Sequence, residues 1–147
     1  MITNNKNRGS IERITCQKEI ILDYLKSVKT HPSAELIFRE VRKKLPRISQ
    51  GTVYRILNNL KNKDKVKAIS VGGITHFDGD VSSHAHFICQ ECHNIYDIFD
   101  ICQECQIIKE QKLKVGKIKN YQIYFYGYCK KCRAKMPRLP KKDSNRK

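Results

Sequence analysis

Apolar residues recur at helical spacing in three segments of the N-terminal half of the chain. Between Thr15 and Lys26 they predict a first helix, with Thr15 as its N-terminal cap. Ser33 is placed to cap a second helix, which Pro46 ends, and a third helix begins at Ser49. The second helix has an apolar stripe of Ala34, Ile37, Val41 and Leu45, and the third has one of Val53, Ile56, Leu57 and Leu60.

Strand-like segments follow the third helix. Residues 66–70 and 74–77 are joined across a Gly72-Gly73 turn, which favours a β-hairpin. Three helices followed by a hairpin predict a winged helix-turn-helix. Beyond it, the segments HAHFIC, NIYDIF and YQIYFYGYC alternate like strands, and residues 100–114 are compatible with a helix.

These patterns predict an α+β chain of two small domains. The polar, turn-rich stretch after Asp78 marks the boundary. We therefore expect a flexible N-terminal arm over 1–10, a winged-helix domain over 11–78, a hinge over 79–83, a metal-binding dimerisation domain over 84–136, and a disordered basic tail over 137–147. A β-rich domain of this size needs a metal or a partner subunit to supplement its core.

Charge is unevenly distributed over the 147 residues, whose formal net charge is +16. Residues 1–70 carry +10, residues 71–110 carry −6, and residues 111–147 carry +12. The basic segments predict a polyanionic partner, nucleic acid before an anionic membrane surface. No apolar run reaches the ~20 residues of a membrane span, and the N-terminus has no signal-peptide pattern, so a cytoplasmic location is expected.

The outward face of the third helix carries hydrogen-bond donors and one aromatic residue, with no acid among them. Arg, Gln and Asn side chains bond base edges in the DNA major groove, while Tyr, Thr and Lys contact phosphates or thymine methyls. The predicted DNA-contacting residues are Gln50, Thr52, Tyr54, Arg55, Asn58 and Lys61.

The seven cysteines include three CxxC pairs, Cys89/Cys92, Cys102/Cys105 and Cys129/Cys132. Two such pairs form a tetrahedral Cys₄ zinc site, but the spacing does not say which two. The remaining Cys16 is expected to be a small buried core residue of the first helix.

A second candidate site uses nitrogen and oxygen ligands. His84 and His86 stand at i and i+2 of a predicted strand, so both imidazoles project from one face. Asp78, His76, His93 and Asp97 lie near them in the sequence. Such a set suits Fe²⁺, Mn²⁺, Zn²⁺ or Ni²⁺.

Two other functions were considered from the residues alone. A zinc-dependent hydrolase would use the His/Asp cluster with Asp80 or Glu91 as general base, but no motif supports it. An RNA-binding zinc ribbon would need an aromatic platform, for which YQIYFY is the only candidate.

Five segments in order, RITCQKEIILDYL, HPSAELIFREV, SQGTVYRILNNL, HAHFICQECHNIYD and YGYCKKC, resemble the ferric uptake regulator (Fur) family of bacterial metal-dependent repressors. The resemblance implies a winged-helix domain, an α/β dimerisation domain and a homodimer on a palindromic DNA operator. It places the structural zinc on Cys89, Cys92, Cys129 and Cys132. It places a regulatory Fe²⁺ or Mn²⁺ on His31, Asp78, His84, His86 and Asp97.

Aspartates at positions 78 and 97 resemble the peroxide-sensing branch of the family. The resemblance then implies a repressor, not an enzyme, in which iron and peroxide oxidise His31 or His84 and release the DNA. A repressor that senses iron or zinc sufficiency is the alternative within the family. A third metal site of some relatives would fall on Ser83, Ala85 and Tyr121, which are poor ligands. The Cys102/Cys105 pair and His93, where the family usually has Gly, depart from the pattern.

Overall fold

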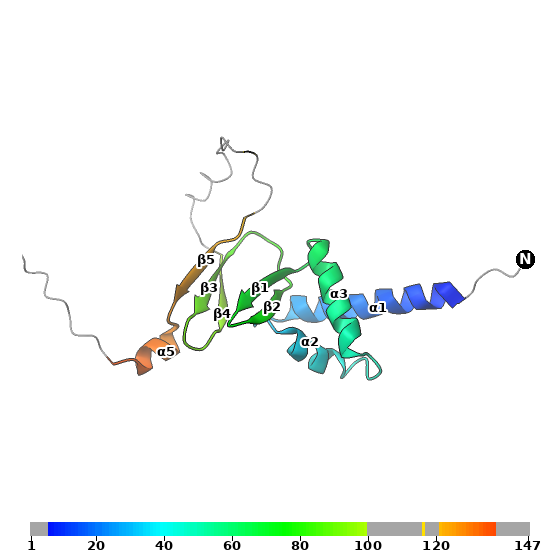
Figure 1. Cartoon of the computed structure of the whole chain (residues 1–147), viewed down its shortest axis with the longest axis horizontal. Coiled ribbons are helices and arrows are strands. Elements are labelled where there is room, and N and C mark those ends of the chain that lie inside the picture. The colour runs from blue at the N-terminus through cyan, green and yellow to red at the C-terminus, as the bar shows by residue number, and fades with distance from the viewer. Residues whose placement is uncertain (1–5, 100–115, 117–120, 138–147) are drawn as a thin grey trace, which may run out of the picture.

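A computed structural model describes residues 6–99, 116 and 121–137, with side chains from residue 14 onward (Figure 1). The helices are α1 (Lys6–Ser27), α2 (Ala34–Val41), α3 (Gln50–Asn62) and α5 (Lys130–Lys135). The strands are β1 (Lys67–Val71), β2 (Ile74–Asp78), β3 (Ala85–Cys89), β4 (Ile95–Ile98) and β5 (Tyr124–Gly127). No described helix is long and apolar enough to cross a membrane.

The first three helices pack around one apolar core, as the sequence pattern predicts. Ser33 caps α2 by accepting a hydrogen bond from the Leu36 amide at 3.3 Å, and Ser49 caps α3 by accepting one from the Thr52 amide at 3.1 Å. The predicted stripe of α3 is fully covered. The buried core consists of Ile21, Leu25, Ala34, Ile37, Val41, Ile48, Val53, Ile56, Leu57, Leu60, Val66 and Phe77.

Three expectations for the helices were wrong. Helix α1 begins at Lys6, so residues 6–10 are helical instead of a flexible arm, and Thr15 is an interior residue. No proline interrupts this stretch, so nothing stops the helix from continuing upstream. Helix α2 ends at Val41, and Leu45 packs on the core from the following turn.

Cys16 is exposed instead of buried. It lies one helical turn before the half-buried Ile20 of α1. Its side chain lines an open hollow that Leu45 and Pro46 also line, so it faces this hollow instead of the core.

The β1–β2 hairpin forms as predicted. Val71 pairs with Ile74 across a two-residue turn, in which Gly72 and Gly73 both have positive φ (58° and 80°). Glycine adopts this conformation without a Cβ clash, so the Gly-Gly pair supports the tight turn.

The C-terminal part is a three-stranded sheet in the order β4-β3-β5, with β3 antiparallel to β4 and parallel to β5. Helix α5 follows β5 and has no buried residue. The predicted helix over 100–114, the pair Cys102/Cys105 and residues 138–147 of the predicted tail lie outside the described residues.

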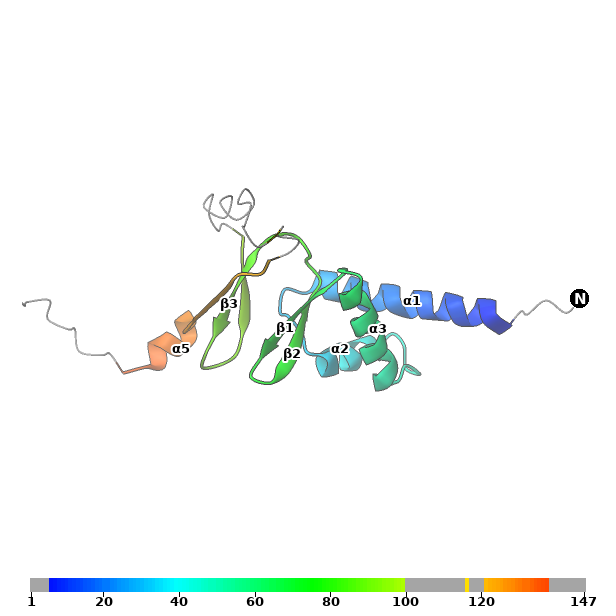
Figure 2. The same ribbon diagram turned by 45° about the horizontal axis from the view of Figure 1, so that its top comes forward.

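A second apolar cluster joins the hairpin to this sheet. Ile69 and Val71 of β1 pack against Ile88 of β3 and Ile95 of β4, with Tyr124 alongside. In two views the hairpin lies between the three helices and the C-terminal sheet (Figures 1 and 2). The hairpin therefore fixes how the two halves of the molecule face each other.

Candidate metal centres and nucleic-acid interface

Four cysteines from two distant segments form the first candidate centre. Cys89 ends β3 and Cys92 lies in the turn after it, while Cys129 precedes α5 and Cys132 lies within it. The four sulfurs lie within 4.8 Å of one another, and Cys92 Sγ is 3.8 Å from Cys129 Sγ. Neighbouring sulfurs of a tetrahedral site with Zn–S bonds of about 2.3 Å are about 3.8 Å apart, so the arrangement fits zinc.

The thiols of this centre have contrasting environments. Backbone amides of Cys129 and Cys92 lower the pKa of Cys89 to about 6. Hydrogen bonding to Cys129, together with burial, raises the pKa of Cys132 to about 12. Four neighbouring thiols therefore do not all ionise unaided, and a bound dication is what would hold them as thiolates.

The second centre gathers the five predicted nitrogen and oxygen ligands, whose ligand atoms lie within 4.8 Å of one another. His31 comes from the loop between α1 and α2, and Asp78 ends β2. His84 directly precedes β3, His86 lies in β3, and Asp97 lies in β4. One buried cluster thus draws side chains from both halves of the molecule.

The distances within this cluster are short. Asp78 Oδ2 lies 3.1 Å from His84 Nε2 and 3.3 Å from His86 Nε2. Asp97 Oδ1 lies 2.8 Å from His31 Nε2 and 3.4 Å from His84 Nε2. His31, Asp78 and His86 are buried.

Unsatisfied atoms in the cluster fit a cation. His31 Nε2 and Asp97 Oδ1, although 2.8 Å apart, form no hydrogen bond with each other or with any other described atom. Buried polar atoms without a partner are costly. Both atoms are electron-pair donors that converge on one centre, so a divalent cation would satisfy them together.

The tautomer of His84 supports the same interpretation. Its Nδ1 lies 3.0 Å from the Ser82 carbonyl oxygen, which accepts, so Nδ1 carries the proton. In the neutral ring, Nε2 then presents a lone pair toward Asp78 Oδ2 and Asp97 Oδ1. The Nε2 lone pair thus faces one oxygen of each carboxylate, at 3.1 and 3.4 Å, and a cation between these atoms would stabilise the arrangement.

Ionisation also favours ligand binding. Burial lowers the pKa of His31, and the carboxylates of Asp97 and Asp78 only partly offset this effect, so the ring is neutral near pH 7. Burial alone would raise the pKa of Asp78, but hydrogen bonds from His86 and the Asp80 amide, with the nearby histidines, lower it. A neutral imidazole and an ionised carboxylate are the forms that bind metals.

Two histidines near this cluster in sequence do not join it. His76 Nδ1 donates a hydrogen bond of 2.8 Å to the His31 carbonyl oxygen. His93 lies beside the hairpin turn, where a Cβ added at Gly72 would be 3.4 Å from its Nδ1. His93 has φ of 58°, a conformation that glycine adopts more easily. At the positions of the third metal site of some relatives, which we expect to be absent from this chain, the hydroxyls of Ser83 and Tyr121 are 3.4 Å apart.

The outward face of α3 is accessible, as predicted, except that Thr52 is half-buried. Tyr54, Arg55, Asn58 and Lys61 are exposed. The Thr52 hydroxyl hydrogen-bonds the capping Ser49 hydroxyl at 2.8 Å, so Thr52 also has a role in starting the helix. Tyr54, Asn58 and Lys61 line a hollow shared with the hairpin, and Arg55 lines a separate hollow beside α1.

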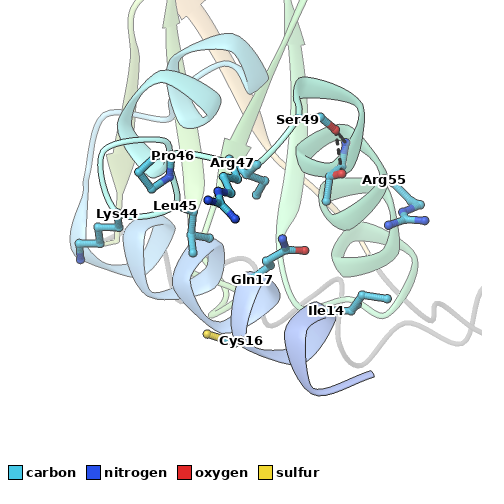
Figure 3. Close-up of a pocket in the computed structure, with 11 residues that line it drawn as sticks. Ile14, Cys16, Gln17, Lys44, Leu45, Pro46, Arg47, Ser49 and Arg55 are labelled. Atoms are coloured by element: carbon cyan, nitrogen blue, oxygen red, sulfur yellow. Dashed lines mark hydrogen bonds between the residues drawn. The ribbon is translucent and has the colours of Figure 1, made fainter. Parts of the chain in front are cut away.

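A hollow of about 590 Å³ adjoins this face between α1, the turn after α2 and the start of α3 (Figure 3). Its lining includes three cationic side chains and no carboxylate. These are Lys44, Arg47 and Arg55. Sequence reasoning did not predict Lys44 and Arg47 as functional, although the basic run 42–47 was the available signal.

Comparison with known proteins decides the family. The ferric uptake regulator family model matches residues 10–126. The chain belongs to the ferric uptake regulator family. It is 34% identical over 124 residues to the peroxide-responsive repressor PerR of Staphylococcus aureus, a match that covers 84% of each chain.

Solved Fur-family structures share the fold. The Campylobacter jejuni peroxide stress regulator superposes with a TM-score of 0.75 at 27% identity, covering 90% of this chain and all of that one. The Helicobacter pylori ferric uptake regulator, described as having three functional metal-binding sites, superposes with a TM-score of 0.67 at 25% identity. That match covers 87% of this chain and 89% of the other.

Membership of the Fur family confirms several predictions. The fold is α+β, with a winged-helix DNA-binding domain and a C-terminal dimerisation domain. Fur-family proteins are transcriptional regulators, not enzymes, which removes the hydrolase alternative. Members of the family bind metals, bind DNA and are dimeric.

Proposed function

We propose that this Fur-family protein is a metal-dependent repressor that senses peroxide. The cluster of His31, Asp78, His84, His86 and Asp97 supports this proposal most directly, because its unpartnered nitrogen and oxygen atoms suit Fe²⁺ or Mn²⁺. The relation to the S. aureus peroxide-responsive repressor supports the choice of signal. The cysteine centre is proposed to hold structural Zn²⁺ on Cys89, Cys92, Cys129 and Cys132.

The regulatory cluster couples metal binding to DNA binding. His31 belongs to the helical domain, while His84, His86 and Asp97 belong to the C-terminal sheet. A metal that uses ligands from both sides binds the closed arrangement better than an open one. That difference in affinity is the coupling free energy that would favour the DNA-binding form.

Peroxide would reverse this coupling by removing a ligand. Bound Fe²⁺ would supply the redox chemistry that activates peroxide. Overall, one peroxide would place one oxygen atom on a ring carbon of His31 or His84 and leave one water, so the ring is oxidised by two electrons while the peroxide is reduced by two. His31 Nε2 and His84 Nε2 each lie within 3.1 Å of a carboxylate oxygen of the cluster, and a ring that gains an oxygen atom no longer offers the same lone pair. Loss of a ligand that ties the domains together would then release the closed arrangement and the DNA.

For DNA recognition, we place the outward face of α3 in the major groove of a palindromic operator bound by a homodimer. The contacting residues are Gln50, Thr52, Tyr54, Arg55, Asn58 and Lys61. The basic hollow beside this face would receive a phosphate-bearing strand. The aromatic residues exposed on and after β5, Phe125, Tyr126 and Tyr128, are proposed to contact the partner subunit.

The Fe²⁺-loaded protein tests the proposed signal. Brief peroxide treatment should add one oxygen atom to the peptide containing His31 or His84, detected by mass spectrometry, and should abolish operator binding. The Mn²⁺-loaded protein is the matched control and should stay unmodified. An iron- or zinc-sufficiency repressor would lose no histidine to oxidation, so an unmodified iron form would overturn peroxide sensing.

The His84→Ala variant tests the site itself. It should retain zinc but lose the dependence of operator binding on added Mn²⁺. Unchanged Mn²⁺ dependence would show that the regulatory metal binds elsewhere.

A further inference from the structure

Lys29 and Phe99 each lie two residues from a proposed regulatory ligand. Lys29 precedes His31 in the loop after α1, and Phe99 follows Asp97 at the end of β4. The Lys29 ammonium lies 5.7 Å from the centre of the Phe99 ring. The loop and the strand end that bring His31 to Asp97 therefore make a second contact just outside the metal cluster.

Phe99 covers one of the proposed ligands. Its ring centre lies 4.9 Å from that of His84, with the planes inclined at 36°. The His84 side chain is 0% exposed, whereas Phe99 is 52% exposed. Phe99 is thus a solvent-facing lid on a buried imidazole.

Lys29 also contacts the hinge. Its ammonium lies 3.8 Å from Asp80 Oδ2. The other carboxylate oxygen of Asp80 accepts hydrogen bonds from the amide and hydroxyl of Ser82, and the Asp80 amide donates to Asp78 Oδ1 at 2.8 Å. Lys29, which belongs to the helical domain, therefore lies close both to the Asp80 carboxylate in the hinge and to the Phe99 ring that follows β4.

From these contacts we propose that Lys29, Asp80 and Phe99 form a latch that closes the two domains before metal binds and keeps His84 in place. They are positioning residues and not metal ligands. The inference rests on the proposed function, because the cluster that the latch covers is the proposed regulatory site. The latch raises the metal affinity of that site, because less of the metal-binding free energy is then needed to bring the two domains together.

The size and sign of the effect can be stated in advance. A partly exposed cation–π contact and an exposed ion pair together change an equilibrium constant by about fivefold. Coulomb's law acts in the opposite direction, because removing the positive charge of Lys29 should by itself favour a nearby dication. A fall in metal affinity on neutralising Lys29 would therefore reveal the latch.

The experiment is a calorimetric Mn²⁺ titration of the zinc-loaded full chain without DNA. Lys29→Gln should weaken Mn²⁺ binding about fivefold. The matched control is Lys26→Gln, which removes a charge from an exposed lysine lining the same hollow as Lys29 and Asp80. Mn²⁺ affinity should be unchanged or slightly higher in that variant.

Coupling between the two sides of the latch is tested with Phe99→Leu. This variant should also weaken Mn²⁺ binding, and adding Lys29→Gln to it should cost less than Lys29→Gln costs in the wild type, because the cation–π contact is already lost and only the ion pair with Asp80 remains. Zinc content reports whether Phe99→Leu still folds. If it does not, the comparison of Lys29→Gln with Lys26→Gln decides alone.

Opposite outcomes overturn different claims. If Lys29→Gln binds Mn²⁺ as tightly as the wild type or more tightly, or if the effects of Lys29→Gln and Phe99→Leu multiply independently, the latch is wrong while the proposed site stands. If the wild-type zinc-loaded chain binds no Mn²⁺, both the proposed function and the latch are wrong.

Discussion

At the scale of single residues, His31 has an unusual backbone for a residue that precedes a proline. Its φ is 49°, in the left-handed region, which costs of order 1–3 kcal/mol for a non-glycine residue. Strand β2 holds the loop in this conformation. His76 donates to the His31 carbonyl oxygen, and the Phe77 amide donates to that of Pro32 at 3.0 Å. These two hydrogen bonds hold the His31 backbone in its strained conformation, in which the His31 ring lies in the buried cluster.

His76→Ala should therefore weaken the regulatory site without touching a proposed ligand. Loss of the hydrogen bond frees the His31 loop, and we expect Mn²⁺ affinity to fall about tenfold, as for other groups that orient metal ligands. Titration of the zinc-loaded protein measures this change. His93→Asn is the control, since Asn tolerates positive φ and His93 lies outside the cluster. Equal losses in both variants would contradict the role of His76.

At this scale the sequence indicates which residue types could bind a metal, but it does not indicate which side chains lie next to each other. The His84/His86 spacing and the CxxC pairs mark candidate ligands. No spacing rule relates His31 to Asp97, and that assignment came from family resemblance. Lys29 and Phe99 carry no motif, because exposed lysines and phenylalanines are common. Their contact exists only through the packing of the loop against β4.

At the scale of elements, strong periodicity was the reliable guide. Helix α3 has four buried residues on one stripe and a serine cap, so its start and its buried face were both predictable. Helix α5 was missed because its six residues bury nothing, and hence no apolar period exists to detect. The start of α1 was also missed, since polar residues upstream of Thr15 neither favour burial nor break a helix.

The hinge after β2 approaches α1 so closely that only glycine fits there. A Cβ at Gly79 would lie 2.6 Å from the Leu25 carbonyl carbon and 2.8 Å from its oxygen, both backbone atoms. Gly79→Ala should push the hinge away and lower the free energy of unfolding by about 1–3 kcal/mol. It should also weaken Mn²⁺ binding, because Asp78 is the preceding residue.

Gly51→Ala is the matched control for this change. Gly51 lies in the first turn of α3, and nothing stands within 4 Å of its added Cβ. Alanine favours helices over glycine by up to about 1 kcal/mol, so stability should stay equal or rise slightly. Chemical denaturation of both variants compares the two effects, and a Gly79→Ala protein as stable as the wild type would contradict the close approach.

At the scale of the whole molecule, the charge pattern and the fold give two separate surfaces. The acidic middle segment supplies four of the five proposed regulatory ligands, Asp78, His84, His86 and Asp97, and lies at the junction of the domains. The basic N-terminal segment supplies α3 and the cationic hollow beside it. The proposed metal and DNA surfaces therefore lie at different places, and we propose that they communicate through the closed arrangement.

The two kinds of basic residue at the DNA surface should differ measurably. Arg55→Ala removes a side chain placed to bond a base edge, so operator affinity should fall by about 1–3 kcal/mol and discrimination at one base position should weaken. Lys44→Gln with Arg47→Gln removes two charges from the hollow. This double variant should weaken operator and random DNA alike and reduce the slope of log K against log salt by about 1.8.

Fluorescence anisotropy with operator and random duplexes over a range of salt concentrations separates these effects. Both variants retain the metal clusters, so Mn²⁺ dependence should survive in each, which distinguishes lost DNA contacts from lost activation. If Lys44 and Arg47 changed sequence preference, they would read bases instead of phosphates. If Arg55→Ala weakened binding to both duplexes equally, Arg55 would contact a phosphate and not a base. Its neighbours Tyr54 and Asn58 would then have to read the bases.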